Sequence, residues 1–380
     1  MRLLHLADLH LGKRVNEFSM LQDQEYILEQ ILTIACTKRV DGVLVAGDVF
    51  DKPVPSVEAV SLLDDFLTKL AGYHMPVYLI SGNHDSARRL SFAAQLIEKS
   101  HIYVAGEYLG EVKKVCVQDD FGPVDIYLLP FIKPAQVRAV WKEEAQGIET
   151  FQDAVSFVLQ KTPLEKTHRN ILVAQQFVAG ASVCDSEERS VGGMEQIAVS
   201  CFEGFDYVAL GHLHGPQQAG RETFRYAGTP LKYSFSEISH HKSVTLVELR
   251  QKGEVHMELY PLIPLHEMRQ IRGSYEEITR RTSYENTDTE DYMRIILTDE
   301  EDIFDAVGKL RAIYPNLMRL EYDNTRTRNH LTEQAAVQAE EKGPAELVDE
   351  LFRMQNNKPM SAEQSAYMEN LIRQVWEERV

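Results

Sequence analysis

The first part of the chain alternates between short apolar runs and longer segments with helical periodicity. Apolar runs at 2–7, 42–46 and 75–80 predict buried strands, whereas 20–38 and 56–70 carry apolar side chains along one helical face. Strands that alternate with helices in this way are typical of a parallel sheet with helical crossovers.

Beyond a helix expected at 90–100, the pattern changes to shorter β-rich runs broken by Gly, Asp and Pro. Runs at 102–104, 112–117 and 124–129 predict antiparallel strands. A helix is expected at 150–160, and further strands are expected at 170–174, 207–210, 224–227 and 243–249. Helices combined with two groups of strands predict an α/β fold in which a two-sheet sandwich is flanked by helices.

The C-terminal third predicts separate smaller parts. We expect one large domain over 1–264, a small α+β cap domain over 265–324, a polar linker over 325–343 and a helix-loop-helix over 344–380. The cap contains strand candidates at 292–297 and 317–321 around a helix at 303–313. Two amphipathic helices are expected at 345–354 and 362–378, and Ser361 and Gln364 form a capping box at the start of the second.

Composition excludes some classes of protein. The 380 residues carry a formal net charge of -18, so the surface as a whole is not a basic nucleic-acid-binding surface, although bound metal ions add local positive charge. The four cysteines show no zinc-finger spacing. With neither a leader pattern nor a stretch of transmembrane length, a soluble cytoplasmic protein without membrane contact is expected.

Polar side chains with metal-binding chemistry follow several of the predicted strands. They are Asp8 and His10, then Asp48, then Asn83 and His84, then His212 and His214. Mixed oxygen and imidazole ligands favour manganese, iron or zinc over calcium, and two such ions can clamp a phosphate and activate water for phosphoester hydrolysis. The isolated histidines, such as His5 and His168, are expected to be surface or core residues.

These motifs resemble the calcineurin-like metallophosphoesterase superfamily. The segments HLADLHLGK, AGDVFDKPVP, ISGNHDS, ALGHLHGPQ and YAGTPLKYSFSE resemble the SbcD-type nuclease subunits in particular, strongly up to about residue 249. The resemblance implies a metallophosphoesterase fold in which Asp8, His10, Asp48 and His214 hold one ion, most simply Mn²⁺. It also implies a second ion held by Asp48, Asn83, His212 and a further histidine. His84 is expected to stabilise the transition state or protonate the leaving oxygen, with Asp51 and Asp85 orienting it and the nearby loops.

One position departs from the resembled family. The predicted strand at 171–174 is normally followed there by a histidine and then Gln-Phe, but this chain continues with Gln175, Gln176 and Phe177. Gln175 is therefore the expected ligand, and a glutamine oxygen binds manganese or zinc less well than imidazole does. We expect the second ion to be weakly held and turnover to be reduced.

The resemblance also implies partners. It implies a DNA nuclease acting on duplex ends, hairpins and single strands, as a homodimer within a heterotetramer with an SbcC-type coiled-coil ATPase that the C-terminal helices grip. Those helices could instead fold back on the cap. Basic residues just beyond the metal-site loops could contact DNA phosphates or form a solvated rim: Lys13, Arg14, Lys52, Arg88 and Arg89.

Two rival functions stay open from the sequence. The first is a general phosphodiesterase or phosphatase of the same superfamily, which would prefer a small ester to hairpin DNA. The second is a DNA-end-binding scaffold of the same complex, catalytically impaired by Gln175. Such a scaffold would bind one metal ion or none, whereas a nuclease would bind two.

Overall fold

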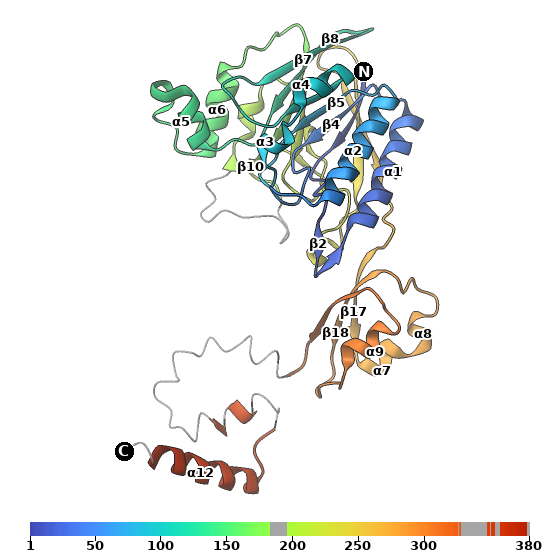
Figure 1. Ribbon diagram of the computed structural model, residues 1–380, viewed down its shortest axis with the longest axis vertical. Coiled ribbons are helices and arrows are strands. Elements are labelled where there is room, and N and C mark those ends of the chain that lie inside the picture. The colour runs from blue at the N-terminus through green and yellow to red at the C-terminus, as the bar shows by residue number, and fades with distance from the viewer. Residues whose placement is uncertain (183–195, 326, 328–347, 350, 354–357, 378–380) are drawn as a thin grey trace. The chain divides into compact units, whose positions relative to one another are not determined.

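The computed structural model describes residues 1–182, 196–325, 327, 348–349, 351–353 and 358–377. The chain separates into two compact units, Met1–His266 and Glu267–Val380, which are considered individually below. Figure 1 labels their helices and strands.

The first unit contains a six-stranded mixed sheet whose centre is parallel. Its order is β16 (Val255–Pro261), β15 (Ser243–Leu249), β1 (Arg2–Leu6), β4 (Gly42–Ala46), β5 (Val77–Ile80) and β6 (Ile102–Ala105). Strands β1, β4, β5 and β6 are mutually parallel, while β15 runs antiparallel to β1 and β16. The carboxyl ends of β1, β4 and β5 therefore share one edge.

A second six-stranded sheet faces the first. Its order is β13 (Gln217–Ala219), β14 (Arg221–Tyr226), β12 (Tyr207–Gly211), β9 (Arg169–Gln175), β8 (Gly122–Leu129) and β7 (Lys113–Asp119). Strand β9 is parallel to both β8 and β12, so Gln175 lies directly beside Gly211 where the two strands end.

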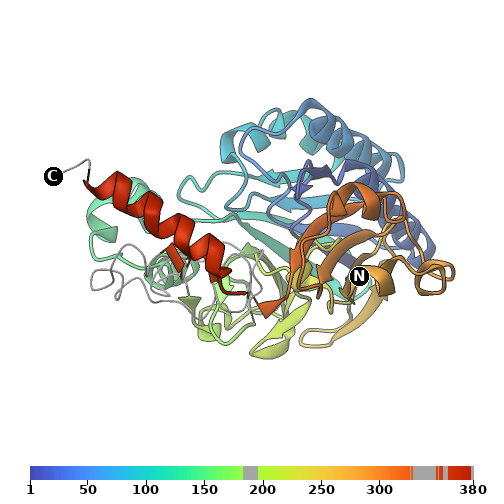
Figure 2. The same cartoon turned by 90° about the horizontal axis from the view of Figure 1, so that it is seen from below.

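Apolar side chains from both sheets form the core between them. Leu3, Leu44 and Tyr78 of the first sheet belong to one buried cluster with Ile126 and Ile171 of the second. The outer face of the second sheet packs against α5 (Pro134–Trp141) and α6 (Phe151–Lys161). Helices α1 (Leu21–Lys38) and α2 (Val57–Gly72) lie beside the first sheet, and the layers can be followed from below in Figure 2. This arrangement confirms the predicted α/β sandwich with helices outside.

Helix α2 shows how the local sequence fixes an element. The Ser56 hydroxyl accepts a hydrogen bond from the Ala59 amide at 3.3 Å, which caps the helix at its start. Ala59, Leu63, Phe66 and Leu70 are buried, and their spacing of three to four residues places them on one face.

Two predictions after β5 are wrong in detail. The run at 102–104 becomes β6, which joins the first sheet as a parallel strand and not an antiparallel one. The helix expected at 90–100 is divided into α3 (Ala87–Leu90), α4 (Ala94–Ile97) and a 3₁₀ turn (Glu98–Ser100). Ala93 has φ +58°, a left-handed conformation that a continuous helix does not contain.

The second unit contains a three-stranded parallel sheet, β17 (Met268–Gly273), β18 (Tyr292–Leu297) and β19 (Leu317–Tyr322), with short helices α7 (Tyr275–Thr279), α8 (Arg281–Tyr284) and α9 (Ala306–Arg311). Its apolar cluster includes Ile278, Ile295 and Leu310. The expected strands at 292–297 and 317–321 are confirmed, whereas β17 was not anticipated.

Helix α12 (Ala362–Glu377) starts with the predicted capping box. The Gln364 amide donates to the Ser361 hydroxyl at 3.2 Å, and the Ser361 amide donates to the Gln364 side chain at 2.9 Å. Most of the expected linker at 325–343 and half of the helix expected at 345–354 lie outside the described residues, while the described residues 348–349 and 351–353 are helical. Among the helices that the structure describes, none combines the length and apolar character needed to span a bilayer.

Candidate metal centre

Loops from both sheets bring the predicted site residues together. The first sheet supplies Asp8 and His10 after β1, Asp48 after β4, and Asn83 and His84 after β5. The second sheet supplies Gln175 at the end of β9 and His212 and His214 after β12. In α/β sheets, the carboxyl ends of parallel strands are where ligands bind.

The loop backbones turn sharply to aim these side chains. Asp8, His10, Asp48 and His212 all have positive φ, at 52°, 44°, 44° and 104°. Non-glycine residues rarely adopt this conformation, which concentrates at functional sites. Gly211 is required for another reason, because a Cβ there would collide with the backbone oxygen of Ala46, so the ends of β12 and β4 approach closely.

His10 lies at the middle of the first half of the site. Its ring is completely buried, and neither ring nitrogen has a hydrogen-bond partner among the described residues. The ring centroids of His84 and His214 lie 4.8 and 5.1 Å away. Potential ligand atoms of His10, Asp48 and His84 all lie within 4.8 Å of one another. The nearest carboxylate oxygens, of Asp48 and Asp51, lie 4.0 and 3.8 Å from its two nitrogens, and a buried imidazole without hydrogen bonds between carboxylates fits a bound cation.

Burial is the main cause of the pKa shifts of His10 and Asp48. It holds the pKa of His10 well below its ordinary range, with the neighbouring His214 and His84 adding to the effect. Burial likewise raises the pKa of Asp48 to about 7, although His84 opposes this shift. Neutral imidazoles are the form that binds metals, whereas Asp48 requires a nearby positive charge to stay ionised.

The second half of the site contains Asn83, His212 and Gln175, and the Asp8 carboxylate of the first half borders it. The His212 amide donates to the two carboxylate oxygens of Asp8 at 2.9 and 3.0 Å. Its ring Nδ1 lies 3.1 Å from Asn83 Oδ1, and burial lowers the pKa of His212 to about 4. The His212 ring is therefore neutral, with one nitrogen fixed by Asn83.

Gln175 presents its amide nitrogen to this oxygen-rich group. Nε2 donates to Asn83 Oδ1 at 3.2 Å and to Asp8 Oδ1 at 3.4 Å, and the side chain also hydrogen-bonds Asp48. Its Oε1 has no hydrogen-bond partner among the described residues and occupies space that a Cβ on Gly47 or Gly82 would fill. In this position Gln175 directs its hydrogen-bond donors toward Asn83 and Asp8, while its oxygen lies beside Gly47 and Gly82.

Asp85 braces two of the loops. Its carboxylate accepts hydrogen bonds from the amides of Val49 at 3.0 Å, Phe50 at 2.9 Å and Gly82 at 2.9 Å. The loop after β4 is thus tied to the loop after β5, which holds Asp48 and His84 in register.

Asp51 contacts His84 through its backbone. His84 Nδ1 lies 3.2 Å from the Asp51 backbone oxygen, while the Asp51 carboxylate pairs with Lys13 Nζ at 2.7 Å. The His84 amide donates to Asp48 Oδ1 at 2.8 Å. These bonds hold the His84 backbone and ring in place through its amide and Nδ1.

A buried charged network behind His214 was missed by the sequence reasoning. His214 Nδ1 lies 3.3 Å from Glu237 Oε1, and Lys242 Nζ lies 2.6 Å from Glu237 Oε2. Burial alone would raise the pKa of Glu237, but His214 and Lys242 outweigh it and hold that pKa well below its ordinary range. An ionised carboxylate fixes Nδ1 as the protonated nitrogen and directs Nε2 toward a metal. The only signal was the position of Glu237 at the end of YAGTPLKYSFSE.

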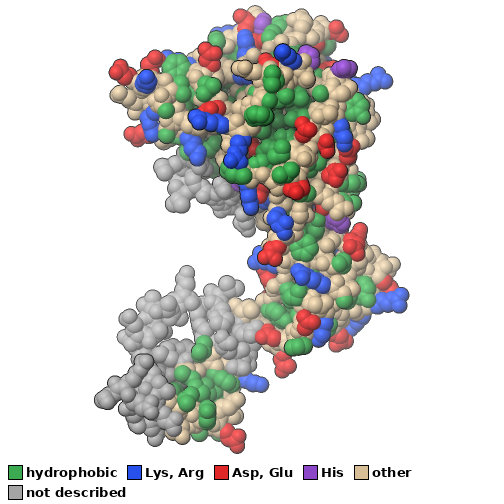
Figure 3. Space-filling model, in the orientation of Figure 1, with side chains coloured by type: hydrophobic (Ala, Val, Ile, Leu, Met, Phe, Trp, Pro, Cys, Tyr) green, Lys and Arg blue, Asp and Glu red, His purple; other side chains and the backbone are tan. Residues whose placement is uncertain are grey.

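The predicted DNA-contacting residues differ in their surroundings. Lys13 is engaged by Asp51, and Arg88, with 86% of its side chain exposed, lies 3.5 Å from a Glu107 carboxylate oxygen. The remaining three are exposed: Arg14, Lys52 and Arg89. Over the face drawn in Figure 3, basic and acidic side chains are interspersed.

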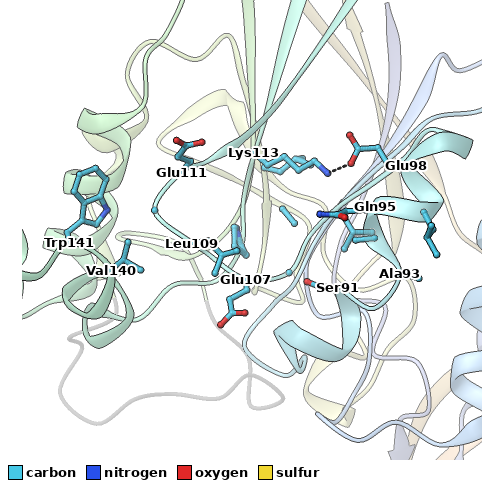
Figure 4. Close-up of a pocket in the computed structure, with 18 residues that line it drawn as sticks. Ser91, Ala93, Gln95, Glu98, Glu107, Leu109, Glu111, Lys113, Val140 and Trp141 are labelled. Carbon is cyan, nitrogen blue, oxygen red and sulfur yellow. Dashed lines mark hydrogen bonds and ion pairs between the residues drawn. The ribbon is translucent and has the colours of Figure 1, made fainter.

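A cavity of about 980 Å³ lies elsewhere in the first unit (Figure 4). Leu109, Val140 and Trp141 line it, and the ion pair between Lys113 and Glu98 crosses its rim at 2.8 Å. None of its lining residues belongs to the metal centre. The candidate chemistry is therefore at the loops and not in this cavity.

Comparison with known proteins identifies two matching families and a relative over nearly the full chain. Residues 1–216 match the family described as calcineurin-like phosphoesterase, and 264–356 match a family described as the Type 5 capsule protein repressor C-terminal domain. The chain is 29% identical over 380 residues to a Staphylococcus epidermidis protein named as the D subunit of the nuclease SbcCD, and the match covers 98% of each chain.

Two solved structures are similar at 12% identity. TT1561 of Thermus thermophilus matches with a TM-score of 0.38 over 68% of this chain and 98% of that chain. A dimetal phosphatase from Danio rerio matches with a TM-score of 0.42 over 69% of this chain and 96% of that chain.

Proposed function

Because the chain belongs to the calcineurin-like phosphoesterase family, we propose that it is a metal-dependent nuclease that hydrolyses phosphodiester bonds in DNA. The observation that carries the proposal is the buried cluster of His10, Asp48 and His84, whose central imidazole has no hydrogen-bond partner among the described residues. The match over nearly the full chain to a protein named as part of a nuclease supports a nucleic acid, and not a small ester, as substrate.

Two sets of residues hold divalent ions in this proposal, with Mn²⁺ as the first choice. Asp8, His10, Asp48 and His214 form the first set, and Asp48, Asn83, Gln175 and His212 form the second. Bound ions supply positive charge to the phosphate and lower the pKa of water. The first set fits a cation well, since it combines two carboxylates with two buried imidazoles.

The second set fits less well because of Gln175. Its amide hydrogens already engage Asn83 and Asp8, so an ion must displace these hydrogen bonds or the side chain must reverse its amide. An amide oxygen is also a neutral and weaker ligand than imidazole. We infer that this half binds its ion loosely and that the rate of hydrolysis is reduced.

His84 performs the proton chemistry. Its Nδ1 donates to the Asp51 backbone oxygen, so the ring donates from Nε2 to a phosphate oxygen or to the leaving oxygen when it is the doubly protonated imidazolium. Asp85 keeps the loops of Asp48 and His84 in register by accepting their backbone amides.

The other parts of the chain serve the substrate and a partner. Exposed Arg14, Lys52, Arg88 and Arg89, together with Lys13, contact DNA phosphates. Residues 1–264 form the nuclease domain, 265–324 the cap that guides DNA, and 344–380, after the linker at 325–343, the segment that binds an SbcC-type coiled-coil ATPase. The complex is a heterotetramer built on a homodimer of this chain, and it acts on duplex ends, hairpins and single strands in DNA repair.

One further function has support from a specific observation. The hydrogen bonds made by the Gln175 amide favour a DNA-end-binding scaffold of the same complex that hydrolyses little. A scaffold retains DNA binding and stimulates the ATPase without added manganese.

The test is a nuclease assay of the full chain with its ATPase partner on linear duplex and hairpin DNA, with and without Mn²⁺. We expect manganese-dependent cleavage that is lost in His84→Ala, and slow hydrolysis of a nitrophenyl phosphodiester. Faster hydrolysis of the nitrophenyl ester than of DNA would contradict the nuclease proposal and favour a general phosphodiesterase. DNA binding without cleavage would favour the scaffold.

A further inference from the structure

Three potential metal ligands lie together on the second sheet, at a distance from the catalytic candidates. Cys116 on β7 is directly opposite Asp125 on β8, and His168 immediately precedes β9. Ligand atoms of these three side chains lie within 4.8 Å of one another. Neighbouring strands thus place a thiol, a carboxylate and an imidazole at one point.

Asp125 is the buried member of this group. It is completely inaccessible to solvent, and its Oδ1 has no hydrogen-bond partner among the described residues. Its Oδ2 lies 3.1 Å from His168 Nδ1. Asp125 already interacts with the Cys116 thiol and with Lys114 Nζ at 3.4 Å, but its buried Oδ1 has no hydrogen bond among the described residues, which favours a further positive charge there.

The group is separate from the catalytic loops. His168 lies before the first residue of β9, whereas Gln175 is its last. A strand rises about 3.3 Å per residue, so the seven residues of β9 place the two ends about 20 Å apart. An ion at this group would not share a ligand with the metal centre.

The ligand chemistry selects the ion. A thiolate, an imidazole and one carboxylate favour Zn²⁺ over Mn²⁺ or Mg²⁺, and three protein ligands leave a fourth tetrahedral position for water. We propose that Cys116, Asp125 and His168 bind a Zn²⁺ ion that joins β7, β8 and the segment before β9. Strand β7 is the edge strand of its sheet and pairs there only with β8, so the ion would add a second connection between β7 and the rest of the sheet.

Lys114 is the competitor for this position. Its Nζ lies 3.4 Å from Asp125 Oδ2, but 43% of its side chain is exposed. Asp125 is buried, but the lysine half of the pair reaches solvent, so its flexible stem can move the ammonium group into solvent when an ion binds. In the absence of zinc, the Lys114 ammonium group pairs with the Asp125 carboxylate.

Cobalt titration of the chelator-treated full chain tests the proposal, because a thiolate bound to Co²⁺ gives a charge-transfer band in the near ultraviolet. We expect one such band, which added Zn²⁺ removes. Cys116→Ser should abolish the band, while Cys36→Ser and Cys201→Ser, matched changes at the other described cysteines, should retain it. Absence of the band from the unaltered chain, or its survival in Cys116→Ser, would overturn the assignment.

Variants at the other positions sharpen the test. His168→Ala should weaken cobalt binding at least about tenfold, the effect expected even for groups behind a ligand. Lys114→Met should strengthen cobalt binding roughly two- to fivefold, because the ammonium group that competes for Asp125 is removed. Asp48→Asn, a change in the metal centre, should leave the charge-transfer band unchanged. Loss of the band in this variant would mean that the thiolate binds cobalt at the metal centre instead. Circular dichroism of each variant establishes that it is folded, so that a lost band reports a lost ligand.

Discussion

Replacing Gln175 by histidine should convert a loosely held second metal ion into a tightly held one. In the structure, the Gln175 amide donates hydrogen bonds to Asn83 Oδ1 at 3.2 Å and to Asp8 Oδ1 at 3.4 Å. Both of these oxygens are proposed metal ligands. The side chain is fully buried against Gly47 and Gly82, where the absence of a Cβ leaves room for a ring. Gln175→His removes these hydrogen bonds and adds an imidazole ligand.

The size of the effect follows from the ligand chemistry. Changing a residue that hydrogen-bonds to a metal ligand, without binding the metal itself, alters metal affinity about 10- to 100-fold. A direct ligand should do at least as much, which corresponds to roughly 1.4 to 2.8 kcal/mol for the second ion. The first ion should keep all of its ligands, because the change removes only hydrogen bonds from Gln175, those to Asp8 and Asp48 among them, and leaves Asp8, His10, Asp48 and His214 in place.

Electron paramagnetic resonance titration with Mn²⁺ measures this directly, since the signal of free manganese counts the ions bound. We expect one tight and one weak ion in the unaltered chain and two tight ions in Gln175→His, with faster cleavage of linear and hairpin DNA. Gln175→Leu is the matched control, because it removes the amide without adding a ligand and should gain no ion. Equal stoichiometry, affinity and cleavage rate in the unaltered and histidine chains would refute the reasoning.

Three further changes test other parts of the structure. Glu237→Gln should weaken manganese binding about 10- to 100-fold by releasing the His214 ring, and unchanged affinity in calorimetry would contradict this. Gly82→Ala should lower both the melting temperature and manganese affinity, since the added Cβ would collide with Asp48 and Gln175; Gly147→Ala is the control, because its Cβ would meet nothing within 4 Å. Burial lowers the pKa of His5 to about 3, so the unfolded chain binds this proton more readily and stability should fall as pH drops from 6.5 toward 3. The free energy of unfolding, measured with urea at several pH values, should change with pH less steeply in His5→Leu, by up to about 1.4 kcal/mol per pH unit. An unchanged pH dependence would exclude the role of His5.

The sequence contained most of the metal centre because its residues follow buried strands. Asp8, Asp48 and Asn83 each come directly after an apolar run, and parallel strands bring such positions to one edge. The family match over residues 1–216 confirms the resemblance drawn from these motifs. Whether each residue binds a metal stays a prediction.

Contacts made through the fold could not be derived in the same way. Glu237 meets His214 across 23 residues, and Lys242 completes the pair, so nothing in the local periodicity joins them. Strand β17 was missed because its side chains are mostly polar and partly exposed. The interrupted helix after β5 depends on Ala93, whose left-handed conformation its residue type does not predict.

The position of Gln175 explains how the chain can carry this residue without loss of its fold. It ends a central strand whose backbone pairs in register with β12, so Gln175 lies beside Gly211 whatever side chain it bears. The loops of the first sheet are tied together by Asp85, which does not contact Gln175 in any described hydrogen bond. A change at this one side chain therefore alters the affinity of the second metal position while the first keeps its ligands.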